Sequence, residues 1–185
     1  MNAIWIILAV ALLIVILVSV SYNRFATQTA LMENSWANVD TELRRRHDLV
    51  PNLVETVRGY AGHERTTLEQ VTDARSLARA ASGEGAEHNQ GEGMLTSALR
   101  SVLALAEAYP DLKASHHFLD LPRQLTVTED RIQAARRLYN SDVRDYNRRV
   151  SSFPSILVAR LCGYGRADYF ELEPSVRGVV PNVQL

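Results

Sequence analysis

The sequence predicts an all-α protein: an N-terminal transmembrane helix followed by an up-and-down four-helix bundle of long antiparallel helices. An uncharged apolar run fills residues 3–22, and apolar residues then recur with a coiled-coil-like, seven-residue spacing over much of the chain. No segment alternates polar and apolar residues for long enough to indicate a sheet. Helices joined by turns are typical of up-and-down bundles. We expect an anchor at 1–22, a bundle domain at 23–162 and an extended tail at 163–185.

The apolar run is long enough to cross a membrane. Eighteen of its twenty residues are hydrophobic, and a hydrocarbon core about 30 Å thick needs about 20 helical residues. Trp5 and Tyr22 lie near its ends, where aromatic rings prefer the interface, and Arg24 follows. The residues expected to form this anchor are Ile4, Trp5, Ile6, Leu8, Leu12, Leu13, Ile16, Leu17, Tyr22 and Arg24.

A cleaved secretory signal is the alternative for this run. Met1-Asn2 carries no basic side chain, and the run exceeds the usual apolar length of a signal, so an uncleaved anchor is favoured. Arg24 and the run Arg44–Arg46 lie on its C-terminal side. The positive-inside rule therefore predicts a single-pass protein of the cell membrane, with the N-terminus outside and the domain in the cytoplasm.

The first soluble helix is expected from Trp36 onward. Of positions 36, 39, 43, 46, 50, 53, 57 and 60, seven are apolar and Arg46 is the exception. Pro51 interrupts the helical hydrogen bonding, but the stripe keeps its phase, so we expect a kink without a break. The phase slips by one residue before Leu68, and Gly59–His63 is expected to be a kink or a turn between two helices.

The later elements follow from glycine and proline positions. Ala81–Gly93 contains four glycines and no large apolar residue, so it is expected to be the main loop. Met94–Tyr109 has apolar residues on one side of a helix. The last long helix is expected over about Phe118–Phe153, with Pro122 tolerated if the regular helix begins there and Asp120 caps it.

Several motifs, in a fixed order, resemble the LemA family. They are Trp36-Ala37-Asn38-Val39-Asp40, Arg44-Arg45-Arg46-His47-Asp48-Leu49-Val50-Pro51-Asn52-Leu53-Val54-Glu55-Thr56-Val57, Gly59-Tyr60-Ala61 with His63-Glu64, Ala106-Glu107-Ala108-Tyr109-Pro110-Asp111-Leu112-Lys113-Ala114, Ala135-Arg136-Arg137-Leu138-Tyr139-Asn140, Asp145-Tyr146-Asn147, Ser152-Phe153-Pro154 and Phe170-Glu171-Leu172.

This resemblance implies a bacterial single-pass membrane protein with an N-terminal anchor and a four-helix bundle. A relative in the family is linked to formation of the magnetosome membrane, and most members have no established activity. Two features depart from the family pattern: Pro122 stands where a polar helix usually continues, and His116-His117 stands where ordinary polar residues are expected.

No catalytic, metal or cofactor site is predicted. The five histidines form no Glu-x-x-His motif, which a di-iron bundle would need. The chain has no Gly-x-Ser-x-Gly elbow and no phosphate-binding loop. Cys162 lies in an apolar stretch and is expected to behave as a small hydrophobic residue. We therefore expect a protein that is not an enzyme.

The arginines are the more informative polar residues, because nineteen of the twenty basic residues are Arg. They either form solvated helix faces or pair with carboxylates and phosphates, between helices, between subunits or at anionic lipid headgroups. Arg46 is the candidate buried partner, and Asp142 and Arg149 are candidates for the same network. The candidate interaction or interhelix residues are Arg44, Arg45, Arg46, His47, Asp48, Asn52, Arg136, Arg137, Asp142, Asp145 and Arg149, with Arg148 beside them.

Three functions remain open at this point. The favoured one is a membrane-anchored, non-catalytic scaffold that contacts membrane lipid, forms a homo-oligomer and organises membrane or protein partners. The second is an adaptor or regulator of a membrane enzyme such as a protease, docked through the tail. A lipid-acting enzyme is the third. A net charge of −1 gives no reason to expect a nucleic-acid partner.

Overall fold

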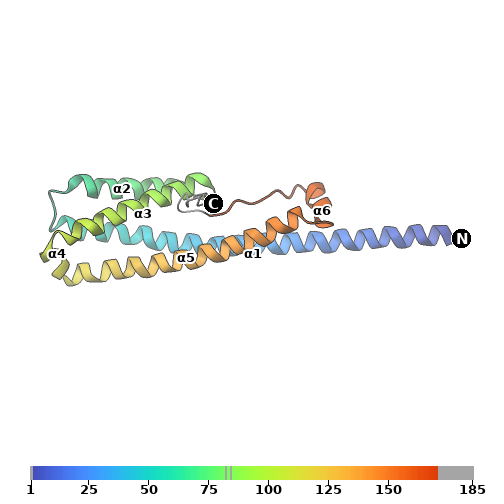
Figure 1. The fold of residues 1–185 in the computed structure, drawn as a ribbon, viewed down its shortest axis with the longest axis horizontal. Helices are drawn as coiled ribbons and strands as arrows, with labels where there is room; N and C mark the ends of the chain where they lie inside the picture. The colour runs from blue at the N-terminus through green and yellow to red at the C-terminus, as the bar shows by residue number, and fades with distance from the viewer. Residues whose placement is uncertain (1, 82, 84, 171–185) are drawn as a thin grey trace, which may run out of the picture. The chain divides into compact units, whose positions relative to one another are not determined.

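A computed structural model describes residues 2–81, 83 and 85–170 of the chain, the side chains of residues 2, 86, 116 and 117 excepted. Within these residues every regular element is a helix (Figure 1). The helices are α1 (Asn2–Arg58), α2 (Arg65–Ala80), α3 (Ala86–Glu107), α4 (Pro110–Ala114), α5 (His116–Ser151) and α6 (Ser155–Cys162). The all-α prediction is therefore confirmed.

The chain divides into two compact units, and α1 and α5 contribute to both. We call Met1–Val39 with Ala134–Tyr169 the stem unit, and Asp40–Gln133 with Phe170–Leu185 the bundle unit. Each unit is described by itself.

The bundle unit is built from four long helical segments. They are the part of α1 from Asp40, the whole of α2 and α3, and the part of α5 up to Gln133, and successive segments run in opposite directions (Figure 1). This is the up-and-down four-helix arrangement that the sequence predicts. The short α4 lies between α3 and α5 and buries Leu112.

The core of the bundle unit follows the apolar stripes. On α1 the stripe residues Val50, Leu53 and Val57 are fully buried, as their spacing predicts. Each such side chain contributes about 1.5–3 kcal/mol when it leaves water. The described core cluster comprises Val50, Leu53, Val54, Val57, Ala61, Leu68, Val71, Ala74, Ala78, Leu95, Leu99, Val102, Ala106, Leu112, Phe118, Leu121 and Leu125.

The stem unit pairs α1 with α5 in antiparallel fashion. The rings of Trp36 and Tyr139 lie 5.3 Å apart, and those of Phe25 and Tyr146 lie 6.2 Å apart. Residue numbers on α5 therefore rise as those on α1 fall. Such aromatic pairs contribute beyond the area they bury. Helix α6 follows α5 and begins at Ser155.

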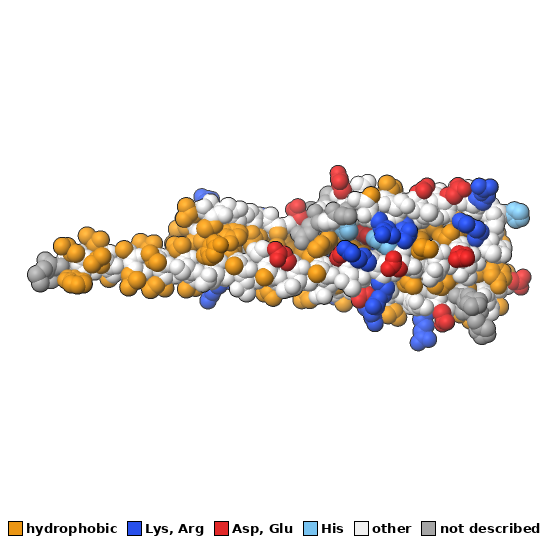
Figure 2. Space-filling view, turned by 180° about the vertical axis from the view of Figure 1, so that it is seen from behind, with side chains coloured by type: hydrophobic (Ala, Val, Ile, Leu, Met, Phe, Trp, Pro, Cys, Tyr) orange, Lys and Arg blue, Asp and Glu red, His pale blue; other side chains and the backbone are white. Residues whose placement is uncertain are grey.

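The apolar run lies within α1. An 18-residue window of this helix has a mean hydropathy of 3.2 and none of its residues is buried, so the helix is long and apolar enough to cross a membrane. Figure 2 shows hydrophobic side chains along this N-terminal stretch. The large apolar side chains among the predicted anchor residues, from Ile4 to Tyr22, are exposed.

The turn after α1 and the unbroken helix at Pro51 agree with the sequence analysis. Helix α1 ends at Arg58 and α2 begins at Arg65, so Gly59–His63 is a turn between two helices. Pro51 lies inside α1, and the helix continues through it. The buried neighbours Val50 and Leu53 keep this turn packed, which offsets the hydrogen bond that proline removes.

The predicted loop over Ala81–Gly93 is wrong in extent, because α3 already begins at Ala86. A Cβ placed at Gly91 would lie 3.0 Å from the Cα of Ala78 on α2. Gly91 therefore allows the backbones of α2 and α3 to approach closely and does not mark a loop. Sequence patterns read clustered glycines as turns because the helix that packs against them is not visible in the sequence.

The last helix begins close to the predicted Phe118, but the predicted cap at Asp120 is wrong. Helix α5 begins at His116, and Pro122 lies inside it, so Asp120 does not cap the helix. Phe118 and Leu121 are buried in the core. Their burial stabilises the first turns enough to offset the hydrogen bond lost at the proline.

Candidate functional site

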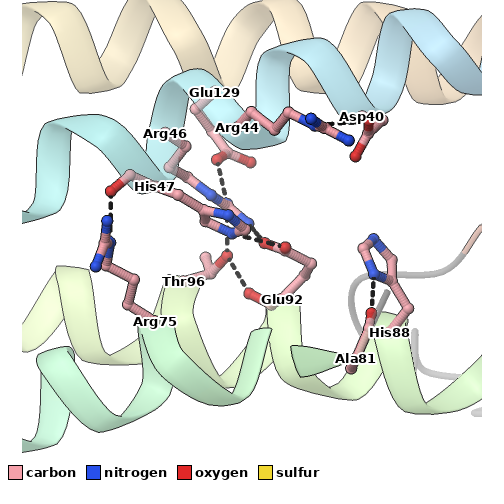
Figure 3. A network of polar contacts seen from close by, with 10 residues as sticks. All are labelled: Asp40, Arg44, Arg46, His47, Arg75, Ala81, His88, Glu92, Thr96 and Glu129. Atoms are coloured by element: carbon pink, nitrogen blue, oxygen red, sulfur yellow. Dashed lines mark hydrogen bonds and ion pairs between the residues drawn. The ribbon is translucent and has the colours of Figure 1, made fainter. Parts of the chain in front are cut away.

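The candidate site is a buried ionic network in the bundle unit, centred on Arg46 of α1 (Figure 3). Arg46 occupies a position on the apolar stripe and is 1% exposed. Its Nη1 donates to Thr96 Oγ1 at 2.9 Å and to Glu129 Oε2 at 3.0 Å. Its Nη2 forms an ion pair with Glu92 Oε2. One guanidinium thus joins α1 to α3 and α5, which suits its planar, multiple-donor geometry.

Glu92 is the most deeply buried acid of this network, with 0% of its surface exposed. One carboxylate oxygen contacts Arg46, and the other lies 2.8 Å from His47 Nε2. This contact is a hydrogen bond donated by His47 when the proton is on Nε2. Thr96 also donates its hydroxyl to the backbone carbonyl of Glu92 at 2.9 Å. The carboxylate is therefore held from two sides by side chains of α1.

The pKa of Glu92 reflects opposing effects. Burial by itself raises the pKa of the carboxyl group, because a buried carboxylate loses its hydration. The hydrogen bond to His47 and the positive charge of Arg46 outweigh this effect and hold the pKa below its ordinary value. Glu92 is therefore a carboxylate at neutral pH, paired with the charge of Arg46.

Further contacts extend the network to the remaining helix. Arg75 of α2 donates its Nε to the backbone carbonyl of His47 at 2.7 Å. Glu129 also accepts a hydrogen bond from Gln133 at 2.9 Å and is partly exposed. All four long segments of the bundle unit thus contribute a side chain. We expect such a network to favour one register of the helices, because each charge has its partners at only one relative position.

The other candidate residues on α1 lie at the surface. Arg44 pairs with Asp40 at 2.8 Å, and Arg45 lies 3.6 Å from Glu42. Asp48 and Asn52 are exposed. Of the α1 candidates, the structure therefore brings together Arg46 and His47.

The candidates of the C-terminal part of α5 all lie in the stem unit. Arg149 donates to Gln28 Oε1 at 2.6 Å, and Asp145 lies 3.3 Å from Arg148. Asp142 is half-buried. The partners that the structure gives Arg46 are Glu92, Glu129 and Thr96, and neither Asp142 nor Arg149 is among them. Arg136 is half-buried and Arg137 is exposed.

Sequence reasoning missed Glu92, Glu129, Thr96 and Arg75. For Glu92 a signal was present: positions 92, 95, 99, 102 and 106 continue one apolar stripe of α3, so Glu92 stands at a core position. The glycines on either side hid this stripe, because they suggested a loop. A charged residue on a stripe position of α3 is the natural partner of Arg46 on a stripe position of α1.

The start of the tail is held in the stem unit. Asn147 of α5 donates its side-chain amide to the carbonyl of Ala167 at 2.8 Å and accepts the Ala167 N–H at 2.9 Å. The ring of Tyr164 stacks on Phe25 with centroids 4.7 Å apart. Residues 164–169 of this unit have no regular secondary structure, and Tyr164 and Ala167 tie them to α1 and α5. The rest of the predicted tail, residues 171–185, lies outside the described residues.

Comparison with known proteins places these features in a family. The sequence model described as the LemA family matches residues 35–185. The chain is 24% identical over 186 residues to the magnetosome proteins MamQ 2 and MamQ 1 of Paramagnetospirillum magneticum, covering 83% of this chain and 66% of theirs. It is 25% identical over 129 residues to protein LemA of Metamycoplasma hominis, covering 70% of this chain and 59% of that protein.

The chain spans just under two thirds of the length of the MamQ relatives. The family match covers far more than half of this chain and includes the α1 segment that carries Arg46 and His47, as well as Glu92 and Glu129. The chain therefore belongs to the LemA family.

Proposed function

We propose that this protein is a membrane-anchored, non-catalytic helical scaffold of the LemA type, which self-associates or organises membrane and protein partners. The observation that carries this proposal is that α1 holds both the exposed apolar run and, farther along, the residues that organise the bundle core. The matches to MamQ and LemA proteins support a membrane-associated role.

The chemistry of the buried network supports a structural role. The carboxylate of Glu92 contacts both Arg46 and His47, so all three side chains already have a polar partner within the network. A general acid or base needs access to a substrate proton, and these side chains are buried. The family names, moreover, do not denote enzymes.

We also propose that the bundle faces the cytoplasm and that the N-terminus lies outside. Arg24 directly follows the apolar run on its C-terminal side, and Arg44–Arg46 lie farther along the chain. Basic residues flanking a span are retained preferentially on the cytoplasmic side. The expected location is the cell membrane, with a single pass.

Self-association is tested by light scattering coupled to size-exclusion chromatography in mild detergent. The full chain is expected to elute as a species of at least twice the chain mass after subtraction of the detergent. Cross-linking in native membranes should give the same stoichiometry. A monomer in both experiments, with no protein recovered on pull-down from those membranes, would contradict the scaffold.

The alternative is an adaptor of a membrane enzyme, docked through the C-terminal tail. Deletion of residues 171–185 tests it, since Tyr164 and Ala167 contact α1 and α5 and their loss would disturb the stem unit. An adaptor should lose its co-purifying partner on this deletion while its helical circular dichroism is unchanged. Unchanged co-purification would show that the tail is not the docking segment.

A further inference from the structure

Helix α6 exposes apolar side chains although it also packs within the stem unit. Val158 and Ala159 are buried, whereas Leu157 is 60% exposed and Leu161 is 79% exposed. Phe153, one residue before the helix's N-cap, is 81% exposed. Leu157 and Leu161 stand four residues apart within α6, which places both exposed side chains on one side of the helix, and the exposed Phe153 precedes that helix. Water is an unfavourable environment for this surface.

This surface lies beside the end of the apolar run. Tyr164, two residues after α6, stacks on Phe25 at 4.7 Å and lies 6.4 Å from the ring of Tyr22, the last residue of the run. Figure 1 shows α6 alongside the corresponding part of α1. Ser21 is buried, whereas most large apolar side chains of the run, Leu17 and Val20 among them, are exposed. The exposed face of α6 is thus next to the boundary where a spanning helix would leave the membrane.

The charges around α6 match a lipid surface. Residues 152–167 contain Arg160 and Arg166 and no Asp or Glu, and the first acidic residue of the chain is Glu33. Arg24 and Arg160 are exposed. Apolar side chains flanked by arginines are typical of helices that lie in the interface and meet anionic headgroups.

We propose that α6 is a second membrane contact of this protein: an interfacial helix that inserts Phe153, Leu157 and Leu161 among lipid acyl chains beside the end of the spanning helix. Arg24 and Arg160 lie at the headgroups. This inference rests on the proposed anchor, because the anchor sets the level of the bilayer. Lipid is favoured over a protein partner because the exposed face adjoins the apolar run and α6 itself carries the exposed Arg160.

The chain carries its own reporter for this contact. Cys162 is the single cysteine, it ends α6, and it is exposed. The full chain is labelled there with an environment-sensitive fluorophore and reconstituted into vesicles of phosphatidylcholine and phosphatidylglycerol in equal amounts. We expect quenching by lipids that carry a nitroxide near the glycerol end of the acyl chain, and weak quenching by aqueous iodide.

A matched control places the label on the same unit but away from the membrane. Asn38→Cys in a Cys162→Ser background puts it at an exposed position of α1, 16 residues beyond Tyr22 and thus about 24 Å along the helix. Iodide should quench the fluorescence of this label, and the lipid nitroxide should not. In the triple variant Phe153→Ser, Leu157→Ser, Leu161→Ser, iodide should quench the Cys162 label and the lipid nitroxide should not, as in the control. The helical circular dichroism should be unchanged.

The outcomes separate this inference from the anchor. Release of the full chain from vesicles by alkaline carbonate would contradict the anchor itself. A chain that stays with the vesicles, with a Cys162 label that iodide quenches and the lipid nitroxide does not, would overturn the α6 contact alone. Protection of the label from both quenchers would also overturn it, because a second copy or another part of the chain would then cover α6.

Discussion

Arg46 places a charge at a core position of α1, where burial removes its hydration. Its partners offset this cost: Glu92 is fully buried beside it, and Thr96 and Glu129 accept further hydrogen bonds. A buried pair of this kind adds little net stability compared with apolar residues of similar volume, but loss of one partner is costly. The arrangement is therefore best understood as a device that specifies one helix register.

The substitution Arg46→Met should destabilise the protein by about 3–5 kcal/mol, because it leaves the Glu92 carboxylate buried without its charged partner. The measurement is urea unfolding followed by circular dichroism. Arg44→Met is the matched control: it removes an exposed pair with Asp40 and should cost at most about 0.5 kcal/mol. The double variant Arg46→Met, Glu92→Gln should lose less unfolding free energy than the two single variants lose in sum. Additive losses would contradict the pairing.

The lowered pKa of Glu92 makes part of the stability pH-dependent. An unfolded Glu has a pKa of about 4.3, and the folded group has a lower one, so the unfolded state binds the proton more readily. The contribution is complete above about pH 4.3 and is lost as the pH falls through the folded pKa. Wild type and Glu92→Gln should therefore converge in unfolding free energy as the pH falls below this value. A difference independent of pH would show that Glu92 does not carry this linkage.

At the scale of elements, the contact between α2 and α3 depends on a glycine inside a helix. Gly91 faces the backbone of Ala78, and a Cβ there would lie 3.0 Å from the Ala78 Cα. Glycine in a helix interior is ordinarily unfavourable by about 1 kcal/mol relative to alanine. Its presence at this position is explained by the close approach of the two helices.

The substitution Gly91→Ala should therefore destabilise the bundle by about 1–3 kcal/mol, although alanine favours the helix, because Ala78 presents backbone atoms that cannot yield without moving α2. Thermal unfolding measures the effect. Gly59→Ala serves as the control, since its Cβ would meet Thr56 O at an ordinary 3.5 Å. A stabilised Gly91→Ala variant would show that α2 and α3 are not in close contact there.

The segment after α6 has no secondary structure of its own and depends on Asn147. The variant Asn147→Ala removes both hydrogen bonds to Ala167, each worth about 1 kcal/mol. Limited trypsin cleavage after the exposed Arg166 should become faster by roughly ten-fold or more. Ser141→Ala, which removes only an exposed hydrogen bond from Arg144, should leave the cleavage rate unchanged. Equal rates in both variants would contradict the role of Asn147.

Over the whole molecule, the charges are distributed unevenly along the chain. The apolar run carries none, and Arg24 and Arg44–Arg46 follow it. This asymmetry is the basis for the proposed orientation, with the bundle in the cytoplasm.

Cysteine labelling in whole cells tests that orientation. With Cys162→Ser as background, Glu87→Cys places a thiol at an exposed position of α3. A membrane-impermeant maleimide should label it after permeabilisation and not in intact spheroplasts. Ala3→Cys, at the opposite end of the apolar run, should be labelled in intact spheroplasts. The reverse pattern would show that the bundle faces outward.

Residue order alone is enough to predict the all-helical class, the apolar run, a kink or turn at Gly59–His63 and the position of Arg46 on a core stripe. These properties follow from local periodicity and composition, which the chain carries without reference to its fold. The LemA motifs likewise identify the family through the identity and order of their residues, and the family model matches residues 35–185.

Which groups meet depends instead on the packing of distant segments. Glu92 was hidden in a glycine-rich segment, and its pairing with Arg46 joins helices at positions 46 residues apart in the chain. The early start of α5 ahead of Pro122 depends on the burial of Phe118 and Leu121 in the core. The physical reason is the same in each case: local propensity is weak beside packing and the pairing of buried charges, which are set by distant parts of the chain.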